Sequence, residues 1–468
     1  MTVAELPRKP GGNSAKGKEQ RANIFATWRR DALGRLVQRR SAEAALLAAQ
    51  SFAAPGKSLH PGFSPAALLT GTGGSSSSRS KAKEDAPLPL YAVRWHQSSP
   101  ADRKPEDGAG EKPPAVLKLT SAPLAEGDLQ RALEAARAGA QIVAAALPTP
   151  GAFCSQEDEV SLGWRFVQLI QRLLEDGVGA RLLVVCPAAA TGALVAGASK
   201  AVAMEDSSLK IQRAFVPLQC LQRLDELVPR LCALSSAHKD ETDLWIRDAG
   251  FRGLPFVPRL ERMPAGSAKA SRLPAHGLDG EPAKLLLTGA TGGLGKAVVS
   301  WLIKEQGFQP EQLLLLRRMG SSKLEGDLAR CTVVEAAKVD STSVLQESLL
   351  QVRGVTGILH LAGVLDDGIV GGMTEDRMRK VAQPKCGMLV ALLNAAKELQ
   401  WPLQWTVGFS STSSLFGYAG QVNYCAANAL LDQLAVFSSE GARPEGDRAP
   451  CRFITVNWGP WGEAGMAQ

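Results

Sequence analysis

The sequence lacks the patterns that mark a zinc protein, a disulfide-bonded secreted protein or an integral membrane protein. Its eight cysteines include no Cys-x-x-Cys pair, and no histidine stands at ligand spacing from any of them. This usage predicts reduced, mostly buried thiols and no metal site. No segment approaches the roughly 20 apolar residues that a membrane-spanning helix needs, and no basic segment followed by an apolar one opens the chain. We therefore expect no membrane span, and a location in the cytoplasm or, if the N-terminus is a targeting segment, in an organelle.

The formal net charge of +7 comes from an N-terminal extension, residues 1–86. This extension contains 14 Lys and Arg against 6 Asp and Glu, so the rest of the chain is close to neutral. A nucleic-acid interface needs its cations clustered on a folded domain. The distribution therefore predicts that nucleic acid is not a partner.

The extension also carries apolar side chains at roughly helical spacing over residues 24–52, which predicts an amphipathic helix or a helix pair. A run of Gly and Ser at 71–78 then predicts a linker. Three roles of the helical segment remain open: packing on the folded part of the chain, docking of another chain, or targeting to an organelle.

From residue 87 onward, strand patterns alternate with helical ones, which is typical of an α/β fold with a largely parallel sheet. The first α/β unit, residues 87–264, has no glycine-rich turn between a strand and a helix, and we predict no cofactor site there. A linker rich in Gly, Ala, Ser and Pro, residues 265–282, precedes a second α/β unit at 283–468. We predict two Rossmann-like subdomains with doubly wound, mostly parallel sheets. Strands are expected in the first unit at 91–95, 141–147, 181–186, 211–217 and 243–247, and helices at 127–138, 160–175 and 221–235.

The second unit opens with a motif for binding the pyrophosphate of a dinucleotide. Residues 284–288 predict an apolar strand and 296–304 a helix, and the turn Thr288-Gly-Ala-Thr-Gly-Gly-Leu-Gly295 joins them. Its glycines permit a tight turn, close approach of the backbone to the pyrophosphate, and close packing of the helix on the strand. The helix N-terminus adds unpaired N–H groups and a positive dipole end. The cofactor contacts predicted in this turn are Thr288, Gly289, Thr291, Gly292, Gly293, Leu294 and Gly295.

The next strand, 313–316, ends in Arg317 and Arg318, where an acidic residue would receive the ribose hydroxyls of NAD. Guanidinium groups suit a 2′-phosphate instead, so the pair predicts NADPH in preference to NADH. A third strand leads into Ala362 and Gly363, in a turn of the kind that flanks the nicotinamide ribose.

Polar residues farther along predict the catalytic site. Ser411 ends a strand, Tyr424 follows thirteen residues later, and Asn428, four positions on, shares a helix face with Tyr424. The Ser and Tyr pair resembles the short-chain dehydrogenases, which normally carry Lys four residues after Tyr. Here Asn428 occupies that position and Lys385 lies upstream, an exchange that resembles the ketoreductase domains of modular, type I polyketide synthases. We interpret His360, the only histidine of the second unit, as structural.

Three further segments are similar to that family: 456–466 and, as the opening and closing strands of its structural subdomain, 90–95 and 256–260. The resemblance implies NADPH-dependent reduction of a β-ketoacyl thioester held by phosphopantetheine on an acyl carrier protein, with other synthase domains nearby. Ser411 and Tyr424 would hydrogen-bond the substrate carbonyl, and Tyr424 would donate the proton as general acid. Lys385 would lower the pKa of Tyr424, and Asn428 would position Lys385 or a water that relays protons.

Other positions bear on stereochemistry and on the cofactor. The motif Leu365-Asp366-Asp367 and Asn423 resemble B-type ketoreductases, which give the D alcohol, whereas Ala419 replaces a proline that is frequent in that type. Family members often have an aspartate near position 338 that contacts the adenine of the cofactor. In this chain the backbone at Val339 or the carboxylate of Asp340 would make that contact.

Two alternatives remain open. One is a ketoreductase of the fatty-acid-synthase type, which uses the same residues. The other is a catalytically silent structural module. Family members continue past residue 466 into a helix that covers the substrate, whereas this chain ends at Gln468, so the second unit is expected to be C-terminally truncated. That departure favours the silent module, and the intact catalytic set argues against it.

Overall fold

The computed structural model describes residues 63–69, 90–98, 112–147, 156–188, 191–247, 254–262, 273, 276–277, 280–321, 323–440 and 451–459. The helical segment predicted at 24–52, the linker predicted at 71–78 and most of the linker 265–282 lie outside the described residues. No described helix combines the length and the apolar character that a membrane crossing requires.

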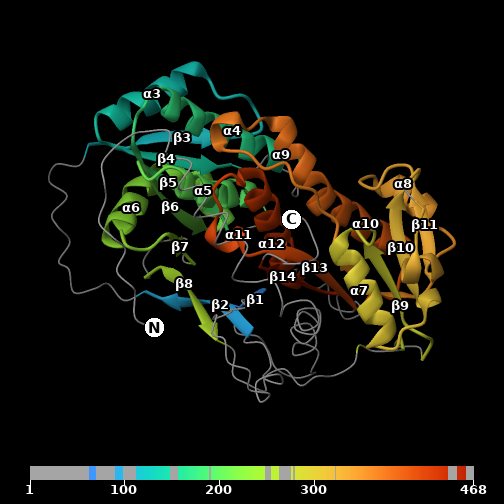
Figure 1. Cartoon of the computed structure of the whole chain (residues 1–468). Coiled ribbons are helices and arrows are strands. Elements are labelled where there is room, and N and C mark those ends of the chain that lie inside the picture. The colour runs from blue at the N-terminus through green and yellow to red at the C-terminus, as the bar shows by residue number, and fades with distance from the viewer. Residues whose placement is uncertain are drawn as a thin grey trace, which may run out of the picture.

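The described strands form one 14-stranded sheet (Figure 1): β2 to β8 come from residues 87–264, β9 to β14 from residues 283–468, and β1 from the N-terminal extension. In the second unit all neighbouring strands are parallel, in the order β11-β10-β9-β12-β13-β14. The order reverses between β9 and β12, and ligands of open α/β sheets bind at the carboxyl ends of strands beside such a reversal. The bounds are β9 Lys284–Thr288, β10 Leu313–Arg318, β11 Thr332–Ala336, β12 Val355–His360, β13 Trp405–Ser411 and β14 Arg452–Trp458.

In the first unit the strands β3 to β7 are parallel and follow one another in chain order, so this half has no such reversal. Antiparallel β8 and β2 come next, and β1 pairs with β2 on one side and with β14 on the other. No pattern in the sequence indicates β1, which joins the halves. The bounds are β1 Phe63–Leu69, β2 Leu90–Gln97, β3 Ala115–Leu119, β4 Gln141–Ala146, β5 Ala180–Pro187, β6 Leu209–Val216, β7 Asp243–Trp245 and β8 Phe256–Arg262.

The α/β fold class predicted from the sequence is confirmed, and the strands form because their side chains are apolar on both faces. Residues 285–287 of β9 are fully buried, as expected for a parallel strand covered by helices on both sides. The helices of the first unit are α3 Glu126–Arg137, α4 Gln156–Glu175, α5 Ala193–Glu205, η1 Leu218–Arg223 and α6 Leu224–Ala237. Those of the second unit are α7 Gly293–Lys304, η2 Pro310–Gln312, η3 Gly326–Arg330, α8 Thr342–Ser348, η4 Val370–Gly372, α9 Glu375–Ala382, the π-helical turn η5 Gln383–Gly387, α10 Met388–Glu398, α11 Ser413–Phe416 and α12 Val422–Glu440.

Helices α5 and α12 pack against each other and join the two units (Figure 1). Gly197 on α5 allows this contact, since a Cβ at that position would lie 2.6 Å from the carbonyl oxygen of Cys425 and 2.7 Å from Cβ of Ala429. One hydrophobic core contains buried side chains of both units, such as Phe166 and Leu431. The first unit therefore supports the helix that carries Tyr424.

Candidate active site

The glycine-rich turn between β9 and α7 packs closely on neighbouring backbone at two of its glycines and is exposed to solvent at two others. Gly289 has a φ of +67°, a conformation that favours glycine, and a Cβ there would lie 2.7 Å from the backbone nitrogen of Ala362. A Cβ on Gly295 would overlap the backbone of Ala290. Gly292 and Gly293 are exposed. The turn can therefore admit a ligand to its backbone, and a side chain at 289 or 295 would disrupt it.

The first unit has a comparable strand-to-helix turn, but one of its own carboxylates occupies the helix N-terminus there. Glu159, fully buried, accepts hydrogen bonds from the backbone N–H of Gly192 at 2.6 Å and of Leu194 at 3.4 Å, at the start of α5. Burial raises the pKa of Glu159 to about 7. Because an acidic side chain already fills the position that a phosphate would take, the first unit is a poor dinucleotide site.

His360 connects the glycine-rich turn to Lys385. Its Nδ1 lies 2.8 Å from the hydroxyl of Thr288, and its Nε2 lies 2.9 Å from the carbonyl oxygen of Lys385. That carbonyl can only accept, so Nε2 donates and Nδ1 accepts from Thr288. Burial lowers the pKa of His360 to about 3. The ring is neutral and links backbone segments, which agrees with a structural role.

Lys385 lies in the π-helical turn η5, and its ammonium group is buried beside the tyrosine. The side chain donates to the carbonyl oxygen of Phe409 at 2.6 Å, and Nζ is 5.8 Å from the ring centre of Tyr424. A Cβ on Gly363 would lie 2.8 Å from Cε of Lys385, so this glycine leaves room for the lysine stem. Burial lowers the pKa of Lys385 to about 8.

Tyr424, Ser411 and Asn428 meet near this ammonium group. Burial raises the pKa of Tyr424 to about 12, and side-chain hydrogen bonds with Asn428 and Ser411 act in the opposite direction. The sequence led us to expect a lowered pKa, but the net shift is upward, because loss of solvent around the phenol outweighs the groups that favour the phenolate. The amide nitrogen of Asn428 donates to the carbonyl oxygen of Tyr424 at 2.9 Å. Its buried Oδ1 has no hydrogen-bond partner within the described part of the chain.

The predicted cofactor-binding arginines differ in their surroundings. Arg317 forms an ion pair with Glu335 on the neighbouring strand at 2.7 Å, whereas Arg318 is exposed at the end of β10. Val339 is half-buried, and the carboxylate of Asp340 contacts the side chain of Gln383. Arg318 is therefore the more accessible of the two cations for a phosphate.

The residues that resemble a B-type motif hold the loop before Tyr424 in place. Asp366 forms an ion pair with Arg377 at 3.0 Å, and its carbonyl oxygen accepts from the amide of Asn423 at 2.8 Å. Asp367 accepts from Gln421 at 2.8 Å. Sequence reasoning missed Arg377, which lies ten positions beyond Asp367 without a recognisable motif.

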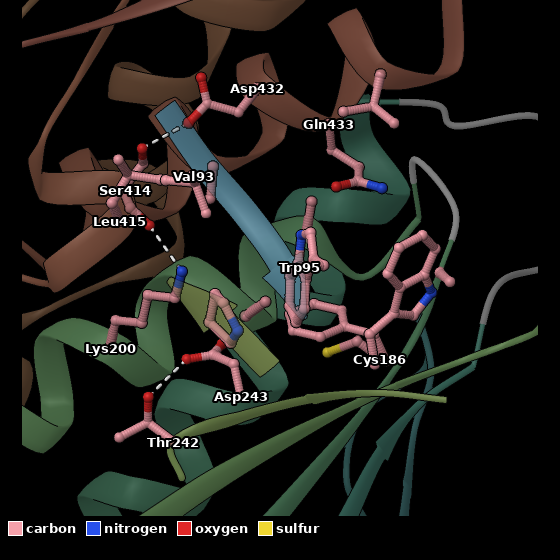
Figure 2. A pocket seen from close by; sticks show the side chains of 18 of the residues that line it. Val93, Trp95, Cys186, Lys200, Thr242, Asp243, Ser414, Leu415, Asp432 and Gln433 are labelled. Carbon is pink, nitrogen blue, oxygen red and sulfur yellow. Dashed lines mark hydrogen bonds between the residues drawn. The ribbon is translucent and has the colours of Figure 1, made fainter. Parts of the chain in front are cut away.

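A cavity of about 370 Å³ is lined by strands β2 and β5 to β8 and by helices α5, α11 and α12, and Figure 2 shows it from close by. None of the predicted site residues lines it. Two of its charged side chains already have partners: Asp243 pairs with Arg213 at 2.8 Å, and Lys200 donates to the carbonyl oxygen of Ser414 at 3.0 Å. We therefore assign the candidate active site to the cluster around Tyr424 and not to this cavity.

The second unit is similar to known proteins. Residues 283–463 match the family model of the KR domain. Polyketide synthase GfsA of Streptomyces halstedii is 36% identical over 242 residues, which are 48% of this chain and 3% of that protein. Spectinabilin polyketide synthase system protein NorA of Streptomyces orinoci is 32% identical over 243 residues, which are 50% of this chain and 12% of that protein. The chain thus matches only a small part of the length of these curated relatives.

Solved structures show the same fold. A structure of A-type ketoreductases from a modular polyketide synthase has a TM-score of 0.61 at 22% identity and covers 81% of this chain and 84% of that one. An N-terminal ketoreductase from the macrolactin assembly line has a TM-score of 0.57 at 17% identity and covers 80% of this chain and 84% of that one. At these identities the likeness concerns the fold alone.

Proposed function

Because residues 283–463 belong to the ketoreductase (KR) domain family and the chain's curated relatives are polyketide synthases, we propose that this protein reduces a β-ketoacyl thioester with NADPH in polyketide biosynthesis. The substrate is carried by the phosphopantetheine arm of an acyl carrier protein, and other synthase domains act beside this one. The observation that carries the proposal is the meeting of Lys385, Tyr424 and Ser411 next to the open turn at the carboxyl end of the parallel sheet.

The residues present fit NADPH. The exposed backbone of Gly292 and Gly293 and the start of α7, which has no side-chain cap, would hold the pyrophosphate. Arg318 would bind the 2′-phosphate, and Arg317 would join it only by sharing its guanidinium with Glu335. Ala362 and Gly363 would border the nicotinamide ribose. When bound, the cofactor supplies the hydride.

The protein's own residues would bind the ketone and supply the proton. Ser411 and Tyr424 would donate hydrogen bonds to the carbonyl oxygen, where negative charge develops during reduction. With its pKa raised to about 12, Tyr424 is protonated at neutral pH, which is the form that a general acid requires. The ammonium group of Lys385 would stabilise the phenolate left after proton transfer, and Oδ1 of Asn428 would accept from the water that restores the proton.

The proposal includes B-type stereochemistry. Asn423 and the loop at Asp366 and Asp367 form one hydrogen-bonded unit on the side of the site that precedes Tyr424. These are the positions where the sequence resembles B-type enzymes. Chiral separation of the alcohol product tests this part of the proposal, and an L alcohol would contradict it.

The test of the reaction is NADPH oxidation with a β-ketoacyl thioester of a short pantetheine mimic. Tyr424→Phe is expected to lower kcat by about 10²- to 10⁴-fold, the range for loss of a general acid. Lys385→Met should also lose activity, whereas Lys397→Met, at an exposed position on α10, serves as its matched control and should keep it. Unchanged turnover of Tyr424→Phe, with the melting temperature preserved, would refute the assignment.

A further inference from the structure

Glu205, the last residue of α5 in the first unit, binds two backbone groups of the second unit. Its carboxylate accepts from the N–H of Val370 at 2.7 Å and from the N–H of Gly420 at 2.9 Å. The two oxygens serve one donor each, Oε2 for Val370 and Oε1 for Gly420. A single side chain thus joins segments that lie 165 and 215 residues farther along the chain.

The two segments border the candidate active site, and we call residues 366–370 and 417–421 the rim. The first rim segment follows the turn at Gly363, and the second leads into α12 just before Tyr424. The segments also bind each other directly, since the N–H of Gly368 donates to the carbonyl oxygen of Gly420 at 2.7 Å. Glu205 binds both members of this pair of segments.

Side chains continue the rim up to the catalytic tyrosine. Gln421 donates to the carboxylate of Asp367, and Asn423 donates to the carbonyl oxygen of Asp366, both at 2.8 Å. The N–H of Tyr424 donates to Oδ1 of Asn423 at 2.9 Å. A continuous set of hydrogen bonds therefore runs from Glu205 through the rim to the backbone of Tyr424.

Helix α5 also contacts the segment between Ser411 and Tyr424 at two other residues. Lys200 donates to the carbonyl oxygen of Ser414 at 3.0 Å, and Figure 2 shows the lysine extending toward this segment. Gly417, with a φ of +76°, lies so close to the carbonyl oxygen of Lys200 that a Cβ there would overlap it. The segment between Ser411 and Tyr424 is therefore held from one helix of the first unit.

The position of Glu205 is unfavourable by local rules. A carboxylate in the last turn of a helix faces the negative end of the helix dipole, and the preceding Met204 is 61% exposed, so solvent would be within reach. Two charge-assisted hydrogen bonds, which are stronger than neutral ones, offset only part of this cost, since burial still raises the pKa of Glu205. Residues that go against the local preferences of secondary structure, as this acidic residue at a helix C-terminus does, are often found at functional sites.

We infer that Glu205 is a positioning residue that holds the rim so that Tyr424 stands at its working distance from Ser411. This role rests on the proposed ketoreductase function. Among the described residues no hydrogen bond joins Glu205 to the cofactor turn at 288–295, so loosening the rim should lower kcat and leave NADPH binding intact.

The experiment compares Glu205→Gln and Glu205→Ala with the wild-type chain. Glutamine keeps one acceptor oxygen and alanine none, so we expect a graded loss of kcat that reaches roughly tenfold to hundredfold in the alanine variant, as for a small misplacement of a catalytic group. The dissociation constant for NADPH, from cofactor fluorescence, should stay within about twofold, because the two sites are separate. Glu226→Gln, an exposed carboxylate on α6, is the matched control and should behave as wild type.

Hydrogen exchange of the amides of Val370 and Gly420 measures their hydrogen bonds to Glu205 independently of enzyme activity. Their exchange should accelerate by about tenfold or more in Glu205→Ala, as expected for loss of a hydrogen bond to a charged group, whereas the amides of β9 should not change. If the wild-type chain reduces no ketone, the proposed function fails, and accelerated exchange still supports the contact. Accelerated exchange with unchanged kcat in an active chain would overturn the positioning role, and unchanged exchange would overturn the contact itself. Glu205→Gln keeps the shape of the side chain and serves if the alanine variant does not fold.

Discussion

The buried ammonium group of Lys385 leads to a sharp prediction about pH. Burial lowers the pKa of this lysine to about 8 from its ordinary 10.5, which corresponds to a destabilisation of the charged form by about 3 kcal/mol. The nearby thiol of Cys386 and the carboxyl of Asp432 act in the opposite direction but do not compensate. The charge that would stabilise the Tyr424 phenolate is therefore lost as pH rises through about 8.

The expected effect is a decrease in kcat/KM for NADPH that begins near pH 8 in the pH–rate profile. If one proton on Lys385 is required, kcat/KM for NADPH falls tenfold per pH unit above the break, so by about 100-fold at pH 10. With an ordinary lysine pKa of 10.5 the loss at pH 10 would be only about a quarter. Tyr424, with a pKa raised to about 12, does not titrate in this window.

The assay is the initial rate of NADPH oxidation between pH 6 and pH 10, corrected for thioester hydrolysis without enzyme. The parameter to follow is kcat/KM for NADPH, because its pH dependence reports the groups of the free enzyme. Lys385→Arg keeps its charge at every pH, so its residual activity should show no break near pH 8. A break above pH 9.5 in the wild-type chain, or an unchanged break in Lys385→Arg, would refute the reasoning.

Two further predictions concern the first unit. The pKa of Glu159 is raised to about 7 from 4.5, so the protonated carboxyl favours the folded state: its stabilisation is full below pH 4.5 and is lost as pH rises to about 7. The free energy of unfolding of the wild-type chain relative to Glu159→Gln should therefore fall by about 3 kcal/mol between pH 4 and pH 8 in urea titrations, and a constant difference would contradict the buried geometry. Gly197→Ala should lower the free energy of unfolding by about 1–3 kcal/mol through overpacking, and it should lower kcat by displacing α12. Gly127→Ala is the control, because its Cβ would meet only the side chain of Arg131, at 3.9 Å, and it should leave stability unchanged or raise it. Equal effects of the two substitutions on stability would refute this packing argument.

Features that neighbouring residues encode could be predicted from the sequence alone. The apolar runs of β9 and β10, the glycine spacing between 288 and 295 and the α/β alternation are all local, because strands, turns and helices depend on residues a few positions apart. The exchange of Lys and Asn at positions 385 and 428 indicated the resemblance to ketoreductase domains of polyketide synthases. In the structure Nζ of Lys385 lies 5.8 Å from the ring centre of Tyr424, and the catalytic roles of the two residues stay predictions.

Features that depend on distant segments emerged only from the folded chain. Helix α5 escaped prediction because it lies between the two units and is buried on nearly every side, which removes the polar face that periodicity needs. The pKa of Tyr424 rises and does not fall, because the direction depends on how completely the fold excludes water. Glu159 and Glu205 carry no local signal: each carboxylate gains its role from backbone groups 33 to 215 residues away, which only folding brings within hydrogen-bonding distance.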